Sequence, residues 1–512
     1  MSRHRPHRLI DSDASPDAVI LSSEQCQAIA EKAVKLSKAD ACEVQLGSNA
    51  TGNTRFAANQ MSTSGMVADV QLVVQSSYGA KHAVVVTNEL TDEAIERCVR
   101  ESEALAKLAP DDPEAMPPLG AQQYVPVTAY FDSTAKLTPG DRAKVALDAL
   151  KQTRGKDLLA SGFILTSANC TALANNKGLY AYYRNTSSNY QLTVRTTDGS
   201  GSGWAGVDDQ DWSKIDFNAV HSRAVQKATL SKNPVAIEPG RYTVVFESQA
   251  VGDLVQLIGN YGDARSADEG RSPFTKPMDP PPAVSDSLKG AARDAAMAKR
   301  DSVMKAMKAA GPQTKIGQKI VDERVTIFGD PQDPQLLSQP FDGDGLPVGR
   351  QVFVDKGVLK ELYYSRFWAK KMGRQPTGAP QGMKMEGGTS SVDDLIKSTD
   401  RGVLVTRLWY LREVDPRTIL YTGLTRDGTF LIEGGKINKP IRNFRFNDSP
   451  LVMLNNLEML GRAERVGGTE QGGDIVMPSI KVKDFNFTSL SDAVCLYYGR
   501  RKSEKVNGSR RK

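Results

Sequence analysis

Histidine is scarce in this chain, which has only four among 512 residues. His4 and His7 lie near the N-terminus, His82 lies in a β-rich stretch, and no histidine follows His221. A zinc site built on paired histidines therefore has no donors in the second half of the chain. A Ser-His-Asp triad would need His82 or His221 in a cleft, and the chain contains no G-x-S-x-G motif.

Paired cysteines and long apolar runs are also missing. The chain has five cysteines, Cys26, Cys42, Cys98, Cys170 and Cys495, and no two of them form a C-x-x-C motif. This pattern argues against a zinc ribbon or a disulfide framework and favours reduced, mostly buried thiols. No apolar run approaches the roughly 20 residues that span a bilayer, and no apolar core follows the basic residues at the N-terminus. We therefore expect a cytoplasmic protein without membrane contact.

Nucleotide-binding and nucleic-acid-binding motifs are absent as well. The glycine-rich stretches 199–206 and 467–473 lack the spacing of a P-loop or a dinucleotide fingerprint. The formal net charge of +6 resides in the last residues, because 500–512 hold seven basic side chains and one acidic one. Arg3, Arg5 and Arg8 add three positive charges at the other end, which leaves about −3 for the body. We expect disordered tails over 1–20 and 500–512, and no nucleic-acid partner.

Helical periodicity and capping residues mark the first half of the chain. Helices are predicted over 22–38, 92–108, 139–153 and 221–230, with N-caps at Ser22 or Ser23, Thr91 and Thr138. Short strands are predicted between them, over 43–46, 69–74, 81–86, 163–165, 171–174, 180–184 and 190–195. This order predicts an N-terminal α/β domain over 21–234.

The second half is richer in strand patterns. Strands are predicted over 240–246, 320–327, 351–354, 358–364, 402–411, 418–424 and 476–487, and one apolar helix over 249–259. Residues 426–428 are predicted to form a hairpin turn. A proline-rich stretch at 276–283 and a surface helix over 287–310 predict an insertion at 275–315. The whole chain is therefore expected to be α+β, with a large, mainly antiparallel β-rich C-terminal domain over 235–499.

The most distinctive stretch runs from Leu431 to Gly461. Gly434 and Gly435 predict a tight turn after a strand, since paired glycines tolerate the positive φ that such hairpins need. Residues 437–446 are predicted to return as the second strand. A helix is then predicted from Pro450, because leucines recur at helical spacing up to Leu460 and Gly461 follows them.

The motifs in this stretch, G-G-x-I-x-x-P, F-R-F-N and L-x-x-L-E-x-L-G, resemble the C-terminal signature of the TldD/PmbA family. The resemblance covers roughly 24–495 and is strongest over 340–461; residues 53–61 resemble the family's N-terminal region more weakly. It implies an intracellular metallopeptidase built from two related subunits that enclose a chamber. One subunit type carries zinc and the other, PmbA or TldE, does not.

In zinc-bearing members the helix after a strand like 240–246 carries H-E-x-x-x-H, and a cysteine follows the leucine-rich segment. Aligned here, Gln256, Leu257 and Tyr261 occupy the positions of the first histidine, the glutamate and the second histidine. Gln and Tyr are poor zinc ligands, and Leu cannot accept a proton. Residues 467–473 contain no cysteine. The resemblance therefore implies the zinc-less type, with no cofactor in this chain and zinc in a partner subunit.

Several alternatives remain open. Arg445 and Asn447 are predicted either to line a peptide channel or subunit interface, or to serve the fold, with Asn447 capping a helix and Arg445 paired with a buried acid. Asp253, Asp263 and Asp268 could form a carboxylate site for Mg²⁺ or Ca²⁺. The expected function is to hold small or unfolded peptides beside a zinc-bearing TldD-like partner, as a heterodimer, or beside a second copy, as a homodimer. The competing hypothesis is a stand-alone peptide-binding or scaffold protein without catalysis.

Overall fold

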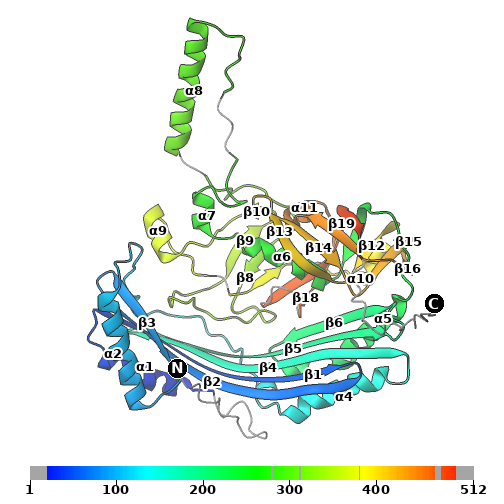
Figure 1. Cartoon of the computed structure of the whole chain (residues 1–512), viewed down its shortest axis with the longest axis horizontal. Coiled ribbons are helices and arrows are strands. Elements are labelled where there is room, and N and C mark those ends of the chain that lie inside the picture. Colours follow the sequence, from blue (N-terminus) through cyan, green and yellow to red (C-terminus); the bar gives the residue numbers. More distant parts are fainter. Residues whose placement is uncertain (1–19, 278–281, 311–312, 380, 468–473, 492–512) are drawn as a thin grey trace, which may run out of the picture.

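The chain folds around two separate β-sheets. The computed structural model describes residues 20–277, 282–310, 313–379, 381–467 and 474–491. A six-stranded sheet contains β1 to β6, and a thirteen-stranded sheet contains β7 to β19 (Figure 1). We call the part up to the end of α5 the N-terminal domain and the part from β7 onward the C-terminal domain. The predicted α+β class and the sheet-rich C-terminal part are confirmed. Of the predicted tails over 1–20 and 500–512, all residues except Ile20 lie outside the described residues.

The N-terminal sheet is antiparallel throughout and has the order β3-β2-β1-β4-β5-β6. Four of its strands are much longer than predicted, because 43–46, 163–165 and the other short segments are pieces of continuous strands. Polar residues such as Asn49 and Asn53 alternate with buried ones on a face that no helix covers, so they interrupt the apolar pattern without ending the strand. The strands are β1 (Ala41–Ala57), β2 (Gln60–Tyr78), β3 (Lys81–Thr87), β4 (Leu158–Asn175), β5 (Tyr180–Thr196) and β6 (Ser202–Asp209).

Helices cover only the outer face of this sheet (Figure 1). The predicted caps are confirmed: Ser22, Thr91 and Thr138 each accept a hydrogen bond from the backbone of the first turn. Two apolar clusters fill the space between helices and sheet, one around Val44 and Ile95 and one around Phe56 and Leu192. The helices are α1 (Ser23–Leu36), α2 (Asp92–Leu108), α3 (Asp132–Ala135), α4 (Pro139–Thr153) and α5 (Phe217–Leu230), with a 3₁₀ turn at Trp212–Lys214.

The C-terminal sheet has the central path β10-β9-β8-β11-β19-β7-β12-β15-β16, and β13, β14, β17 and β18 attach beside it. Only the pairs β11 with β19 and β12 with β7 are parallel among the described strands, so the sheet is mainly antiparallel. Its strands are β7 (Gly240–Phe246), β8 (Ile327–Gly329), β9 (Gln351–Asp355), β10 (Val358–Leu359), β11 (Met383–Met385), β12 (Arg401–Val405), β13 (Leu408–Asp415), β14 (Leu420–Thr425), β15 (Thr429–Glu433), β16 (Lys436–Pro440), β17 (Phe444–Asp448), β18 (Leu457–Arg465) and β19 (Ile475–Leu490).

The distinctive stretch is only partly as predicted. The hairpin between β15 and β16 is confirmed, with Gly434 and Gly435 at φ of 57° and 72°. The predicted return strand over 437–446 divides into β16 and β17, and β17 pairs with β14 and β19 instead. The predicted long helix is wrong: α11 (Pro450–Asn455) is short, and Leu457 and Leu460 lie on β18. Asn455 and Asn456 favour ending a helix over continuing it, and strand pairing with β19 then decides the outcome.

Other predicted strands are shorter or connected differently. Only Ile327 of the predicted strand 320–327 is in a strand, and 358–364 forms just the two residues of β10. Residues 426–428 do not make a hairpin, because β14 pairs with β13 and β17 whereas β15 pairs with β12 and β16. The glycine-rich stretch 199–206 contributes five of its eight residues, 202–206, to β6.

A helical arm leaves the C-terminal domain. α8 (Ala291–Ala310) projects away from the rest of the molecule (Figure 1). At its base, Lys276 donates a backbone hydrogen bond of 2.6 Å to the carbonyl of Gln313, and Lys315 donates one of 2.7 Å to Phe274. Part of the predicted linker, residues 278–281, lies outside the described residues. In the described ranges no helix is long and apolar enough to cross a membrane.

Candidate functional site

The helix after β7 is the segment that the family resemblance aligns with the zinc-binding helix. This helix, α6 (Ser248–Gly259), is buried from Ser248 to Ile258, although Gln249, Asp253 and Gln256 form a polar stripe along it. Val251, Leu254, Val255 and Leu257 have no exposed surface. They pack on β7, β18 and β19 and on α11, within the largest apolar cluster of the C-terminal domain.

The three aligned positions do not converge on one point. Leu257 lies in the core, and Gln256 is 8% exposed on the last turn of α6. Tyr261 lies beyond the helix, because α6 ends at Gly259 and Asn260 is its C-cap. The two histidines of H-E-x-x-x-H lie on one helix, whereas here the second aligned position, Tyr261, lies outside α6.

Tyr261 has a different structural role. Its hydroxyl group donates to the carboxylate of Glu413 and lies 3.2 Å from the hydroxyl of Tyr421. Burial, together with these hydrogen bonds, raises the pKa of Tyr261. The phenol therefore stays neutral and ties the end of α6 to β13 and β14. Gln256, Leu257 and Tyr261 do not fit a zinc ion, which takes thiolate sulfur, imidazole nitrogen or carboxylate oxygen as donors.

The nearby carboxylates also have structural partners. Asp253 accepts hydrogen bonds from Leu408 and Gln249, Asp263 caps α7 (Ala264–Asp268), and Asp268 accepts one of 2.8 Å from the indole of Trp368. Within the described ranges no group of three His, Cys, Asp or Glu side chains is placed to hold a metal ion. The predicted carboxylate site for Mg²⁺ or Ca²⁺ therefore has no matching geometry in the described residues.

A cavity of about 520 Å³ lies at the C-terminal end of α6. Gln256 lines it from the helix, and Asp263, Glu361 and Asp474 bring carboxylates from three other segments. Apolar side chains form most of the remaining wall: Ile258, Phe274, Ile327, Phe353, Val354, Leu359, Leu362, Met383 and Ile475. Burial raises the pKa of both Glu361 and Asp474. A concave, largely apolar site with a few polar groups is typical of a ligand pocket.

The sequence contained little signal for Glu361 and Asp474. Glu361 is the one acid in the segment 360–364 that follows β10, and Asp474 comes directly before β19. Neither belongs to a spaced motif, so only the tertiary structure brings them to the same cavity.

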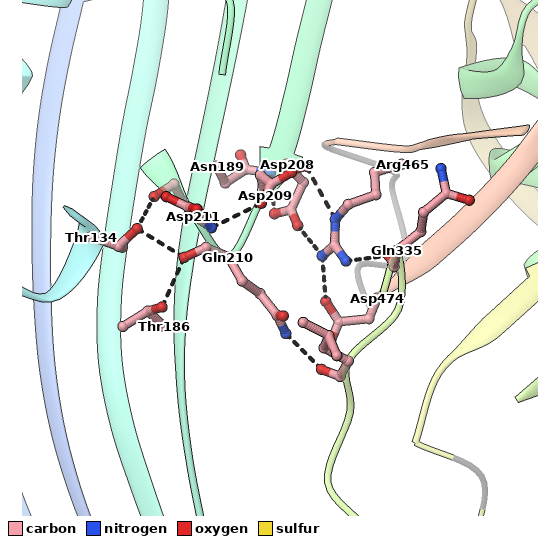
Figure 2. A network of polar contacts seen from close by, with 12 residues as sticks. Thr134, Thr186, Asn189, Asp208, Asp209, Gln210, Asp211, Gln335, Arg465 and Asp474 are labelled. Atoms are coloured by element: carbon pink, nitrogen blue, oxygen red, sulfur yellow. Dashed lines mark hydrogen bonds and ion pairs between the residues drawn. The ribbon is translucent and has the colours of Figure 1, made fainter. Parts of the chain in front are cut away.

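Asp474 also belongs to a network that joins the two domains (Figure 2). Arg465, on β18, donates to the Asp208 carboxylate of β6 over 2.7 Å and to Asp474 over 3.0 Å. The same guanidinium group donates to the carbonyl of Gln335 over 2.6 Å. Such multiple charge-assisted bonds fix a side chain more firmly than a single contact. The wall of the cavity is thus connected to the N-terminal sheet.

A second branch of this network runs through Gln210 (Figure 2). Its backbone carbonyl accepts hydrogen bonds from Thr134 and Thr186, and its side chain donates one of 2.7 Å to the carbonyl of Leu337. Both threonines are buried in the N-terminal domain, whereas Leu337 belongs to the C-terminal domain. The residues that follow β6 therefore connect the two domains beside Asp208.

Alternate residues of β6 face the C-terminal domain along the whole strand. Ser202 donates to Asp427 over 2.6 Å, and Trp204 packs against the guanidinium group of Arg407 at 4.5 Å. Gly206 is in close contact with the carbonyl of Gly467, where an added Cβ would lie only 2.8 Å from that oxygen. With Asp208, these residues make one side of an edge strand into the seam between the domains.

Comparison with known proteins identifies the group to which this fold belongs. The profile of the PmbA/TldA metallopeptidase C-terminal domain matches residues 239–489, and that of the central domain of the same proteins matches residues 132–232. The chain belongs to the PmbA/TldD family. The two matched ranges include α6, the cavity and the seam along β6.

Curated relatives in the PmbA/TldD family match a limited part of the chain. A metalloprotease of Methanothermobacter thermautotrophicus is 29% identical over 170 residues, which are 30% of this chain and 36% of that protein. Metalloprotease PmbA of Escherichia coli O157:H7 is 24% identical over 176 residues, or 33% and 37% of the two chains. The chain thus spans about a third of the length of the curated relatives that it matches.

Solved structures of the PmbA/TldD fold match nearly the whole chain. TldE from Thermococcus kodakarensis superposes with a TM-score of 0.72 and 18% identity, covering 91% of this chain and all of that one. A Thermotoga maritima protein described as a candidate modulator of a DNA gyrase superposes with a TM-score of 0.74 and 17% identity, covering 90% and 100%. These similarities establish the shared fold.

The PmbA/TldD signature residues Arg445 and Asn447 lie on β17, away from the cavity. Arg445 is half-buried and donates to the hydroxyl of Thr422 over 3.3 Å, and Asn447 is exposed. Their predicted roles in the fold are wrong within the described part of the chain, because Ser449 caps α11 and the side chain of Arg445 bonds to a threonine there. Their lining of a channel or subunit interface stays a prediction.

The two histidines that the structure describes have different surroundings. His221, on α5, is only 1% exposed and packs edge-on against Tyr190. Burial lowers the pKa of His221. His82 lies on β3, 3.9 Å from the Asp112 carboxylate. His4 and His7 lie outside the described residues, as do Cys495 and most of 467–473.

Proposed function

We propose that this chain is the metal-free, substrate-holding subunit of a PmbA/TldD-family metallopeptidase that acts on small or unfolded peptides. The proposal rests on the residues of α6 that occupy the aligned zinc-ligand positions. Where zinc-bearing relatives are expected to have H-E-x-x-x-H, this helix has Gln256 and a core leucine, and it ends before Tyr261. Zinc-dependent peptide hydrolysis needs three protein ligands to the metal and a general base, and these positions supply none of them.

The proposed partner is a zinc-bearing member of the same family, which forms a heterodimer with this chain in the cytoplasm. In that complex the partner supplies the zinc and the reacting water. This chain supplies a cavity beside the end of α6 and completes the space in which a peptide is held. Relatives named metalloprotease and a structural neighbour named TldE support a role in peptide hydrolysis.

Reconstitution tests the proposal. The chain is purified alone, its zinc-bearing family member from the same genome is purified alone, and the two are also co-purified. We expect each protein alone to be inactive on unstructured peptides and the co-purified pair to hydrolyse them until a chelator is added. Chelator-sensitive hydrolysis by this chain alone would contradict the proposal.

The same preparation distinguishes the proposed subunit role from that of a stand-alone binding protein. A complex of two different subunits, measured by mass in solution, is expected here. If the chain binds peptides as a monomer or a homodimer and captures no family member, the stand-alone binding protein becomes the better account.

A further inference from the structure

The ionisable side chains that line the cavity at the end of α6 are acidic. Among the described residues, three carboxylates, Asp263, Glu361 and Asp474, line it, and no lysine, arginine or histidine does. Aliphatic and aromatic side chains cover most of the remaining wall, and 520 Å³ is enough for a side chain or a short ligand. An apolar pocket with negative groups favours a ligand that has an apolar body and a positive end.

The three carboxylates differ in their other contacts. Asp263 accepts hydrogen bonds from the backbone of Arg265 and Ser266, and Asp474 is paired with Arg465. The side chain of Glu361 makes no hydrogen bond or ion pair with the residues that the structure describes. An ionised carboxylate in this position is stabilised when a cation enters the cavity, because the cation restores the interactions that burial removes.

The end of α6 adds to the same preference. The carbonyl groups in the last turn of a helix carry a partial negative charge, which favours cations. α6 has no basic residue in its last turn, and its C-cap Asn260 and Gly259 both line the cavity. Both the helix end and Glu361 therefore favour a positively charged ligand.

A divalent metal ion does not suit this arrangement. Within the described ranges, no three acidic, histidine or cysteine side chains approach one another closely enough to hold one. The carboxylates are instead spread around an apolar wall. An alkylammonium or guanidinium group on a hydrocarbon stem matches that spacing, since such side chains bury the stem and keep the charge beside polar groups.

We propose that this cavity binds the positively charged group of a substrate peptide, with Glu361 as its main counter-ion and Phe353 and Met383 against its apolar stem. The proposal rests on the peptide-holding function proposed above and specifies the class of peptide. The charge can come from a lysine or arginine side chain or from the peptide's amino terminus, which have the same chemistry.

Calorimetric titration of the full-length chain with three pentapeptides separates these sources. Ac-Ala-Ala-Lys-Ala-Ala-NH₂ has its charge only on the side chain. The same peptide with norleucine in place of lysine has the stem without the charge, and the unacetylated norleucine peptide has the charge only at its amino terminus. We expect at least one charged peptide to bind about tenfold more tightly than the uncharged one. Whichever of the two charged peptides binds more tightly identifies the source of the charge.

Variants then locate the binding. Glu361→Gln is expected to remove the tenfold preference, and Gln381→Glu, which adds a carboxylate to the lining, is expected to increase it. Glu101→Gln changes an exposed acid on α2 in the other domain and should leave the preference unchanged. Circular dichroism checks that each variant is folded.

Equal binding of the three peptides, no binding of any of them, or a preference that Glu361→Gln leaves intact would overturn the inference. The outcome is separable from that of the proposed function. If the co-purified pair hydrolyses charged and uncharged peptides equally well, the subunit role stands and the cation pocket fails.

Discussion

Arg465 of the C-terminal domain and Asp208 of the N-terminal domain form an ion pair of 2.7 Å at the seam between the two sheets. The arginine side chain is 11% exposed and the aspartate side chain 17%. Because Arg465 also binds Asp474, this one side chain couples the position of β6 to the wall of the cavity. The two domains are therefore joined at the cavity wall through Arg465.

Replacing Arg465 by methionine is expected to lower the free energy of unfolding by about 2–4 kcal/mol. The change leaves Asp208 and Asp474 close together without their shared cation. Chemical denaturation measures the effect. Arg462→Met, at an exposed position on the same strand, is the control and should cost less than about 0.5 kcal/mol. Equal costs for the two variants would contradict a structural role for this ion pair.

Placing glutamate at position 257 tests whether α6 can accept a catalytic base. Leu257 has no exposed surface, so Leu257→Glu buries a carboxylate without a partner and should destabilise the fold by at least about 3 kcal/mol. Leu257→Met keeps the volume and should cost less than about 1.5 kcal/mol. Thermal unfolding compares the two. A stable Leu257→Glu protein would mean that this helix position can face a site.

The acid sensitivity of the fold is expected to depend on His221. Burial lowers the pKa of His221 in the folded state, and the Asp148 and Asp216 carboxylates only partly counteract it. The unfolded chain therefore binds the proton more readily, so the free energy of unfolding falls as pH drops below about 6.5. Unfolding titrations between pH 8 and pH 5 should show a smaller decrease in His221→Phe than in the wild type.

Phe217→Leu provides the control for this titration. Phe217 packs against the same Tyr190 ring, with 5.7 Å between the ring centres, but it cannot bind a proton. This variant should lower stability at every pH without changing the slope. A His221→Phe protein with the wild-type slope would show that His221 is not the responsible group.

The α8 arm is expected to be dispensable for folding. The described residues at its base hold the two chain segments together through Lys276 with Gln313 and through Phe274 with Lys315. Met297 and Met304 are 42% and 46% exposed, so the helix contributes little to the core. Replacing 278–312 by a short Asn-Gly turn should change Tm by less than about 3 °C. A larger decrease in a melting experiment would mean that the arm packs on the body.

The sequence allowed good prediction wherever local signals agreed with the tertiary structure. The caps at Ser22, Thr91 and Thr138 and the helix after β7 could all be located, because their hydrogen bonds and apolar periodicity are local. The full length of the strands in the N-terminal sheet could not be predicted, because the face that no helix covers is polar. Leu457 and Leu460 match a helical repeat, but pairing with β19 places them on a strand.

The candidate site divides in the same way. The absence of metal ligands at Gln256, Leu257 and Tyr261 could be inferred from residue types alone. The carboxylates of Glu361 and Asp474 could not be assigned to one cavity, because more than a hundred residues separate them in the chain. Arg465 and Asp208 were missed for the same reason: a buried ion pair between domains has no sequence motif.

Elemental analysis of the purified chain, without its partner, shows directly whether the chain holds zinc. We expect a zinc content near zero, even after incubation with a small excess of zinc followed by gel filtration. One tightly held zinc ion per chain would contradict this expectation, and the chain would then have to be assayed as a peptidase in its own right.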